Sequence, residues 1–346
     1  MRMTHALVTA SGLVLLMGSG GAAVRAQPAD AKATAVLAQA RKALGGEQKL
    51  AALKALSLRG SYRREASVPG GGGGGGSVFI SMIGPGGPGG PGGPGGAQMS
   101  GDIEIDVEFP DKYIKVDVGT GMMAMTRTEG FEGERPFVDM SSSQPGMRVM
   151  ASRPDDPAAR QLALRRSRED LARLLLGIVA GTQPSFAVTY AYAGQAESPD
   201  GKADVIDVKG ADNFAARLFL DAQSHLPLML TYIAPEPRIV MRASRDSNGS
   251  QAVVAGHAGG GSAPRDPQEL SPEEKERLRK DMQDAEAAPA KMIEYRIFFA
   301  DFREVNGLSL PHHIARGTAE KTTEEWDIKS YKVNPALKAD RFKVGS

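Results

Sequence analysis

The chain has 346 residues, with 42 lysines and arginines against 41 aspartates and glutamates, and its formal net charge is +1. A charge this close to zero provides no whole-protein field for nucleic acid or for an anionic membrane surface. The absence of cysteine excludes disulfides, thiolate metal sites, a cysteine nucleophile and a lipid-modified N-terminal cysteine.

Residues 1–26 have the pattern of a cleaved secretory signal. Arg2 gives a positive start, Ala6–Met17 is an uncharged apolar run, and Val24-Arg25-Ala26 forms a cleavage site of small residues. The apolar run is shorter than the roughly 20 residues that a spanning helix needs, although an uncleaved anchor is the alternative. We expect cleavage after Ala26, a mature net charge of about −1, and a periplasmic protein that is peripheral to a membrane at most.

The first elements of the mature chain are two helices and a strand. A helix is predicted over Ala31–Leu44, with Asp30 as its N-cap and Gly45-Gly46 as its stop. A short second helix is expected at Gln48–Leu56, and Ser57–Glu65 has the composition of a strand.

Residues 69–100 form a glycine- and proline-rich insertion. Gly70–Gly76 is an unbroken glycine run, and prolines recur at every third position within Gly84–Gly96. Such a segment cannot build a packed core, so we expect a flexible hairpin loop. A phosphate-binding glycine loop is excluded because no Gly-Lys-Ser/Thr follows.

Two strands follow the insertion. Gly101–Phe109 alternates acidic residues with Ile103, Ile105 and Val107, which is the pattern of a half-buried strand. Tyr113–Val118 places Ile114 and Val116 on one face. The apolar face of each strand is expected to point toward the core.

A long helix is predicted from Pro157 onward. Its apolar stripe has the spacing i, i+3, i+4 and i+7 and consists of Leu171, Leu174, Leu175 and Ile178. Further strands are expected at Phe186–Tyr192, Ala203–Lys209, Ala216–Asp221, Leu228–Ile233 and Ile239–Arg242.

A second insertion is expected at residues 245–290, where a Gly-rich linker precedes a charged helix that begins at the capping box Ser271–Glu274. Three strands then close the chain, at Met292–Val305, Leu308–Arg316 and Lys321–Tyr331. Asn306-Gly307 joins the first two, and this dipeptide is the strongest signal for a two-residue hairpin turn. Residues 27–346 are therefore expected to form a single α+β domain with two insertions.

The layout resembles the periplasmic outer-membrane lipoprotein-sorting proteins LolA and LolB, together with the related sensor RseB. The matching residues are Ala43–Gly46 with Leu50–Arg59, Phe131–Arg135 leading to Val138, Ala203–Tyr232, and Tyr295–Val344 with Val305–Leu308, Leu310-Pro311 and Asp340–Phe342. The resemblance implies a strongly curved antiparallel half-barrel sheet, here of about ten or eleven strands. It also implies helices that cover the concave face, and an apolar cavity that takes lipoprotein acyl chains in the carriers.

The residues that we expect to line this cavity come from the apolar faces above. They are Ile103, Ile105, Val107, Ile114, Val116, Leu171, Leu174, Leu175, Ile178, Ile297, Phe299, Trp326 and Ile328. Ordinary core packing is the alternative role for each of them.

The sequence favours a non-enzymatic, monomeric carrier of lipid or lipoprotein acyl chains. It contains no His-Glu-x-x-His or Gly-x-Ser-x-Gly motif. His312 and His313 are adjacent in a strand and point to opposite faces, so they cannot bind one metal together. No catalytic residue, cofactor, metal or nucleic acid is therefore expected. The alternative is an envelope sensor that uses the same fold to contact a protein partner without lipid cargo.

Overall fold

The computed structural model describes residues 30–65, 98–120, 125–142, 157–199, 201–236, 239–245, 251–257, 276, 291–338 and 340–343. The expected signal peptide lies outside these residues. The 69–100 insertion also lies outside them, except for its last three residues, which begin a strand. Of the 245–290 insertion, only the residues at 245, 251–257 and 276 are described.

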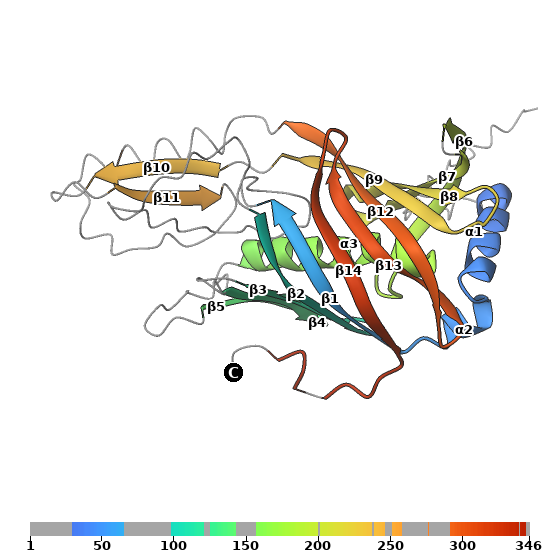
Figure 1. Ribbon diagram of the computed structural model, residues 1–346, viewed down its shortest axis with the longest axis horizontal. Helices are drawn as coiled ribbons and strands as arrows, with labels where there is room; N and C mark the ends of the chain where they lie inside the picture. Colours follow the sequence, from blue (N-terminus) through green and yellow to red (C-terminus); the bar gives the residue numbers. More distant parts are fainter. Residues whose placement is uncertain are drawn as a thin grey trace, which may run out of the picture.

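Twelve strands form one antiparallel sheet in the order β5-β4-β3-β2-β1-β14-β13-β12-β9-β8-β7-β6 (Figure 1). β5 and β6 are its edges, so the sheet is open. The strands are β1 (Ala55–Glu65), β2 (Gln98–Glu108), β3 (Lys112–Gly119), β4 (Met125–Glu132), β5 (Arg135–Ser142), β6 (Val188–Ser198), β7 (Gly201–Gly210), β8 (Ala215–Asp221), β9 (Pro227–Pro235), β12 (Met292–Val305), β13 (Leu308–Thr318) and β14 (Thr322–Val333). A separate two-stranded sheet pairs β10 (Ile239–Arg245) with β11 (Gln251–His257).

Two α-helices accompany the sheet on the side of the apolar core. α3 (Pro157–Val179) contacts β4 and β5 in one wing of the sheet and β8 and β9 in the other, and Figure 1 shows it between the wings. α1 (Ala31–Ala43) lies beside β6. Its cap is Asp30, whose carboxylate accepts hydrogen bonds from the backbone N–H groups of Lys32 at 2.9 Å and Ala33 at 3.1 Å.

The central strands place every second side chain in the core. In the β1–β2 register, Leu56 lies opposite Val107 and Leu58 lies opposite Ile105. All four side chains are at most 3% exposed. Because a strand alternates between two faces, this register fixes the intervening residues, such as Arg59 and Asp106, on the outer face.

Two motifs that carry the sequence resemblance contact each other. The short helix α2 (Glu47–Ala51) follows Gly45-Gly46, and a Cβ atom at Gly45 would lie 2.5 Å from the carbonyl oxygen of Gly307. Gly45 has a φ of +126°, which favours glycine. The hairpin turn at Asn306-Gly307 is thereby packed against the end of α1.

Four elements differ from the sequence prediction. β4 and β5 were not predicted, and the sheet has twelve strands where about ten or eleven were expected. Gln251–His257 forms β11, although its glycine- and alanine-rich surroundings predict a linker. The second helix ends at Ala51 and the chain enters β1 at Ala55, so the expected helix over Gln48–Leu56 is too long.

Candidate functional site

Eleven of the thirteen predicted cavity residues lie in one apolar cluster between the sheet and the helices. None of the eleven is more than 3% exposed. They are Ile103, Ile105, Val107, Leu171, Leu174, Leu175, Ile178, Ile297, Phe299, Trp326 and Ile328. The structure thus brings β2, α3, β12 and β14 together, and in the state described these side chains cover one another.

Ile114 and Val116 lie on the other face of the sheet, and the prediction that they line the interior is wrong. In the β2–β3 register, Ile114 pairs with Asp106 and Val116 pairs with Glu104, both of which point outward. The inward residues of β3 are Tyr113, Lys115 and Asp117, which lie opposite Val107, Ile105 and Ile103. The rule that apolar residues face inward fails here because the inner face of β3 is largely charged.

A buried group of charged side chains occupies the end of the interior where β1 and β13 end and β4 and β14 begin. We call it the charged cluster. Its members are Arg64, Lys115, Asp117, Arg127, Glu129, Arg316 and Glu324 on the sheet, with Asp170 and Arg173 on α3. Sequence reasoning did not find it. The available signal was that charged residues take inward positions in β1, β3 and β4 next to Tyr62, Tyr113 and Phe131.

Each carboxylate of the charged cluster has a cation close by. Arg64 lies 2.5 Å from Glu324 and 3.4 Å from Asp117. Lys115 lies 3.3 Å from Asp117 and 3.7 Å from Glu129. The remaining close pairs are Arg127 with Glu129 at 2.7 Å and Arg173 with Asp170 at 3.1 Å.

Glu324 is held in its ionised form. Burial opposes its ionisation, but the positive charges of Arg64, Lys115 and Arg316 outweigh burial and lower its pKa to about 2. The indole Nε1–H of Trp326 also donates a hydrogen bond to its carboxylate at 2.8 Å. Glu324 is therefore a fixed negative charge at neutral pH.

Two arginines attach the helices to their surroundings. The guanidinium of Arg168 on α3 donates hydrogen bonds to the carbonyl oxygen of Gly133 at 3.2 Å and to the carboxylate of Glu134 at 2.6 Å. Both acceptors lie in the turn between β4 and β5. Arg41 on α1 donates to the carbonyl oxygen of Ala180, just after α3, at 3.2 Å. These contacts fix α3 at its middle, through Arg168, and just after its C-terminal end, at Ala180.

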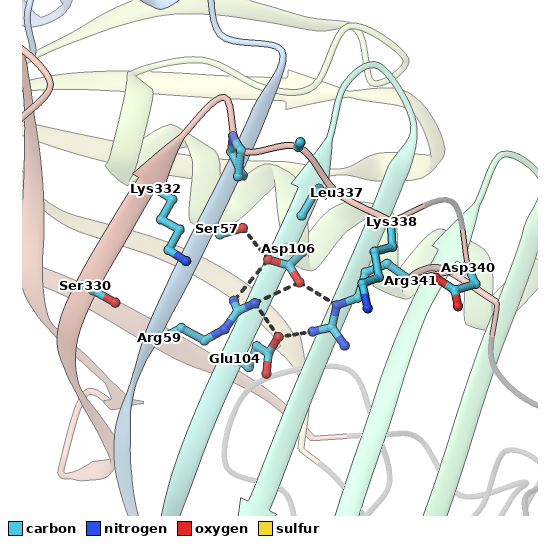
Figure 2. Close-up of a pocket in the computed structure, with 12 residues that line it drawn as sticks. Ser57, Arg59, Glu104, Asp106, Ser330, Lys332, Leu337, Lys338, Asp340 and Arg341 are labelled. Atoms are coloured by element: carbon cyan, nitrogen blue, oxygen red, sulfur yellow. Dashed lines mark hydrogen bonds and ion pairs between the residues drawn. The ribbon is translucent and has the colours of Figure 1, made fainter.

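A pocket of about 310 Å³ lies on the outer face of the sheet, between residues of β1, β2 and β14 and residues 335–338, 340 and 341 of the C-terminal segment (Figure 2). The fully buried carboxylate of Asp106 accepts hydrogen bonds there from Ser57, from Arg59 at 3.0 and 3.1 Å, and from Arg341 at 2.6 Å. Glu104 forms ion pairs with the same two arginines.

Ser57 and Asp106 in this outer pocket are hydrogen-bonded, but Asp106 is poorly suited to act as a base for the Ser57 hydroxyl. Burial raises the pKa of Asp106, but its hydrogen bonds from Arg59, Ser57 and Arg341 outweigh burial, and the net shift is downward. A carboxylate with a lowered pKa is a poor acceptor for the Ser57 proton. The arrangement instead anchors the C-terminal segment to β1 and β2.

Within the described part of the chain, no three or more His, Cys, Asp or Glu residues are grouped so as to hold a metal ion. His312 and His313 have separate partners, the carbonyl oxygen of Leu310 at 3.0 Å and the carboxylate of Asp327 at 2.9 Å. Among the described helices, none is both long enough and apolar enough to cross a membrane.

No protein-family model matches the chain, and no match is found among curated proteins. Among solved structures it is similar to a LolA superfamily protein from Nitrosomonas europaea, at 10% identity and a TM-score of 0.42 over 90% of this chain and 97% of that one. It is similar to a domain assigned to outer membrane lipoprotein sorting from Vibrio parahaemolyticus, at 8% identity and a TM-score of 0.38 over 89% and 94%. It is also similar to a DUF1329 family protein from Desulfovibrio piger, at 7% identity and a TM-score of 0.41 over 90% and 97%.

Two of these three structures come from the group of proteins that the sequence motifs resemble. All three TM-scores lie below 0.5, so the likeness assigns neither a function nor a ligand to the chain.

Proposed function

We propose that the protein is a periplasmic carrier that shelters acyl chains between its curved sheet and α3. The observation that carries this proposal is a continuous apolar layer on the inner face of the sheet, from β2 across β14 to β12. The helix α3 covers part of this layer. Separating α3 from the sheet would expose this layer without breaking a strand pairing, because the helix is not part of the hydrogen-bonded sheet.

The energetics favour binding by burial alone. Each CH₂ group removed from water contributes about 0.8 kcal/mol, so a chain of about 16 carbons contributes on the order of 10 kcal/mol. That amount is available to offset the cost of displacing α3. Leu171, Leu174 and Leu175 of α3 belong to the same buried cluster as Ile297 and Phe299, and an acyl chain would replace part of this packing.

The first experiment is to purify the protein, expressed with its own N-terminal segment, from the periplasm of a Gram-negative host. Native mass spectrometry and lipid extraction then show what is bound. We expect co-purifying acyl species that detergent displaces. A protein without bound lipid that captures one specific envelope protein would favour the sensor alternative and contradict the carrier.

A matched pair of variants tests whether the acyl chain binds in the apolar layer. Leu175→Gln places an amide in the apolar layer, whereas Leu228→Gln changes a β9 leucine that is 41% exposed. We expect the first variant to lose binding of a fluorescent fatty acid and the second to retain it, with circular dichroism confirming that both are folded. Equal binding by the two variants would place the acyl chain elsewhere.

A further inference from the structure

Arg316 is a buried cation whose guanidinium forms no hydrogen bond or close ion pair with a carboxylate among the described residues. The residue is 6% exposed, and its guanidinium stacks on the ring of Trp326 at 4.2 Å from the centroid. Among the described residues, none accepts a hydrogen bond from its side chain or pairs with it, and its Nε is buried without a partner. The guanidinium is planar and its N–H groups lie in that plane. When one of its faces stacks on a ring, these N–H groups remain available to a hydrogen-bond acceptor.

The carboxylates near Arg316 are already occupied. Glu324 lies directly opposite it in the β13–β14 register, but Glu324 accepts from Arg64 at 2.5 Å and from the Trp326 indole at 2.8 Å. Asp170 pairs with Arg173 at 3.1 Å. Burial raises the pKa of Asp170, against the lowering effect of Arg173 and Arg316. A buried cation without a direct hydrogen-bonding partner is costly, and an anionic group from outside the protein would satisfy the N–H groups of Arg316.

The apolar layer runs directly up to this guanidinium. In the β12–β13 register Arg316 lies opposite Ile297, and Ile314 precedes it on the same face, opposite Phe299. A ligand whose hydrocarbon chain lay along Phe299 and Ile297 would therefore bring its polar end to Arg316. The two surfaces together match an amphiphile with one negative charge at its head.

The charged cluster also reaches the surface at this end. The side chains of Arg64, Glu129 and Asp170 are 20%, 15% and 16% exposed to solvent. A polar head at Arg316 can thus lie near water while its chain is buried.

We propose that Arg316 binds the anionic group, a phosphate or a carboxylate, of an acyl ligand held in the apolar layer. This inference rests on the proposed function, which it deepens by defining the ligand as an anionic amphiphile. Lys115, which lies 5.3 Å from the Trp326 ring centroid, adds positive charge to the same region.

The test uses decyl phosphate, decanoate and uncharged decyl glucoside, each below its critical micelle concentration, and inorganic phosphate alone. Trp326 is the sole tryptophan of the chain, so its fluorescence reports directly on the site. Calorimetry supplies an independent affinity. A charge-assisted hydrogen bond in a buried site predicts that the full chain binds decyl phosphate and decanoate about tenfold or more tightly than decyl glucoside.

Arg316→Gln should remove this preference and leave glucoside binding unchanged. Arg316→Lys should keep part of the preference, and it remains informative if the glutamine variant does not fold. Arg303→Gln, at a β12 arginine whose side chain is 62% exposed, is the matched control and should behave as the wild type does.

The outcomes separate the two proposals. If no decyl compound binds, the carrier function itself is contradicted. If all three decyl compounds bind equally, or if Arg316→Gln keeps the anionic preference, the carrier stands and the role of Arg316 is overturned. If inorganic phosphate binds as tightly as decyl phosphate, the site takes a free anion, and the assignment to an acyl ligand is overturned.

Discussion

Gly177 of α3 lies directly against the ring of Phe299 on β12: a Cβ atom at position 177 would come within 1.9 Å of the ring carbon Cζ and 2.2 Å of both Cε atoms. The absence of a side chain at this point lets the helix approach the middle of the sheet. The close approach of α3 to β12 therefore requires that position 177 carry no side chain.

Gly177→Ala should destabilise the protein by about 1–3 kcal/mol, because the ring or the helix must move to admit the methyl group. The measurement is the free energy of unfolding in urea. Gly181→Ala is the control, since a Cβ there would meet nothing closer than 3.8 Å. The double variant Gly177→Ala/Phe299→Leu should recover part of the loss. A Gly177→Ala protein as stable as the wild type would contradict the close packing of α3 on β12.

The C-terminal segment is anchored by Arg341, whose Nε donates to the buried Asp106 at 2.6 Å. Arg341→Gln should cost about 1–3 kcal/mol of unfolding free energy and make residues near the C-terminus more sensitive to protease, because a charge-assisted hydrogen bond is lost. Asp106→Asn should cost more, about 3–5 kcal/mol, because Arg59 and Arg341 both lose a charged partner.

Arg63→Gln provides the control for this pair of variants. Arg63 pairs with Glu325 at 3.0 Å, but its side chain is 51% exposed, and exposed ion pairs contribute little. A loss for Arg341→Gln no larger than that for Arg63→Gln would show that the segment is not held by Asp106.

The sequence correctly predicted the elements that a specific turn dipeptide or a regular apolar spacing defines. Asn306-Gly307 defines the β12–β13 hairpin. The stripe Leu171, Leu174, Leu175 and Ile178 is buried as predicted, although α3 is buried on all sides there and includes Arg173, which the helical spacing places on the exposed side. These features are local, because a turn dipeptide and a helical spacing are both contained within a few residues.

The faces of β3 and the existence of β4 could not be predicted in the same way. Alternation shows which residues share a face, but only the partner strands show which face is inside. In β3 the inward residues include Lys115 and Asp117, and in β4 they include Arg127 and Glu129. The rule that charged residues face solvent therefore assigns the wrong face of these strands to the interior. These charges pair with one another and with charged residues of β1 and β14. Pairing between residues so far apart in the sequence is not visible in a local pattern.

Acid should destabilise the protein through Glu324. Its pKa in the folded state, about 2, lies below the ordinary value of 4.5, so its contribution to stability is fully present above pH 4.5 and is lost as the pH falls toward 2. The contribution is on the order of 3 kcal/mol. Glu129, whose pKa is also lowered against the effect of burial by Arg127 and Lys115, adds to the same trend.

The check is urea unfolding between pH 5 and pH 2. Glu324→Gln should be less stable than the wild type at pH 5 and should lose less stability on acidification. Glu325→Gln, at the neighbouring exposed residue that pairs with Arg63, should follow the wild-type profile. A Glu324→Gln profile parallel to that of the wild type would show that this carboxylate does not produce the acid sensitivity.

Arg168 should control how readily α3 separates from the sheet. Its guanidinium joins the helix to Gly133 and Glu134 in the β4–β5 turn, so Arg168→Ala should increase the hydrogen exchange of α3 amides and speed the uptake of a fluorescent fatty acid by the protein. Arg165→Ala is the matched control, because among the described residues Arg165 forms an ion pair within the helix, with Glu169 at 3.8 Å, and its side chain is 47% exposed. If α3 exchanges at the same rate in both variants, the β4–β5 turn does not restrain the helix. Faster exchange in Arg168→Ala without faster uptake would show that α3 separates from the β4–β5 turn without admitting an acyl chain.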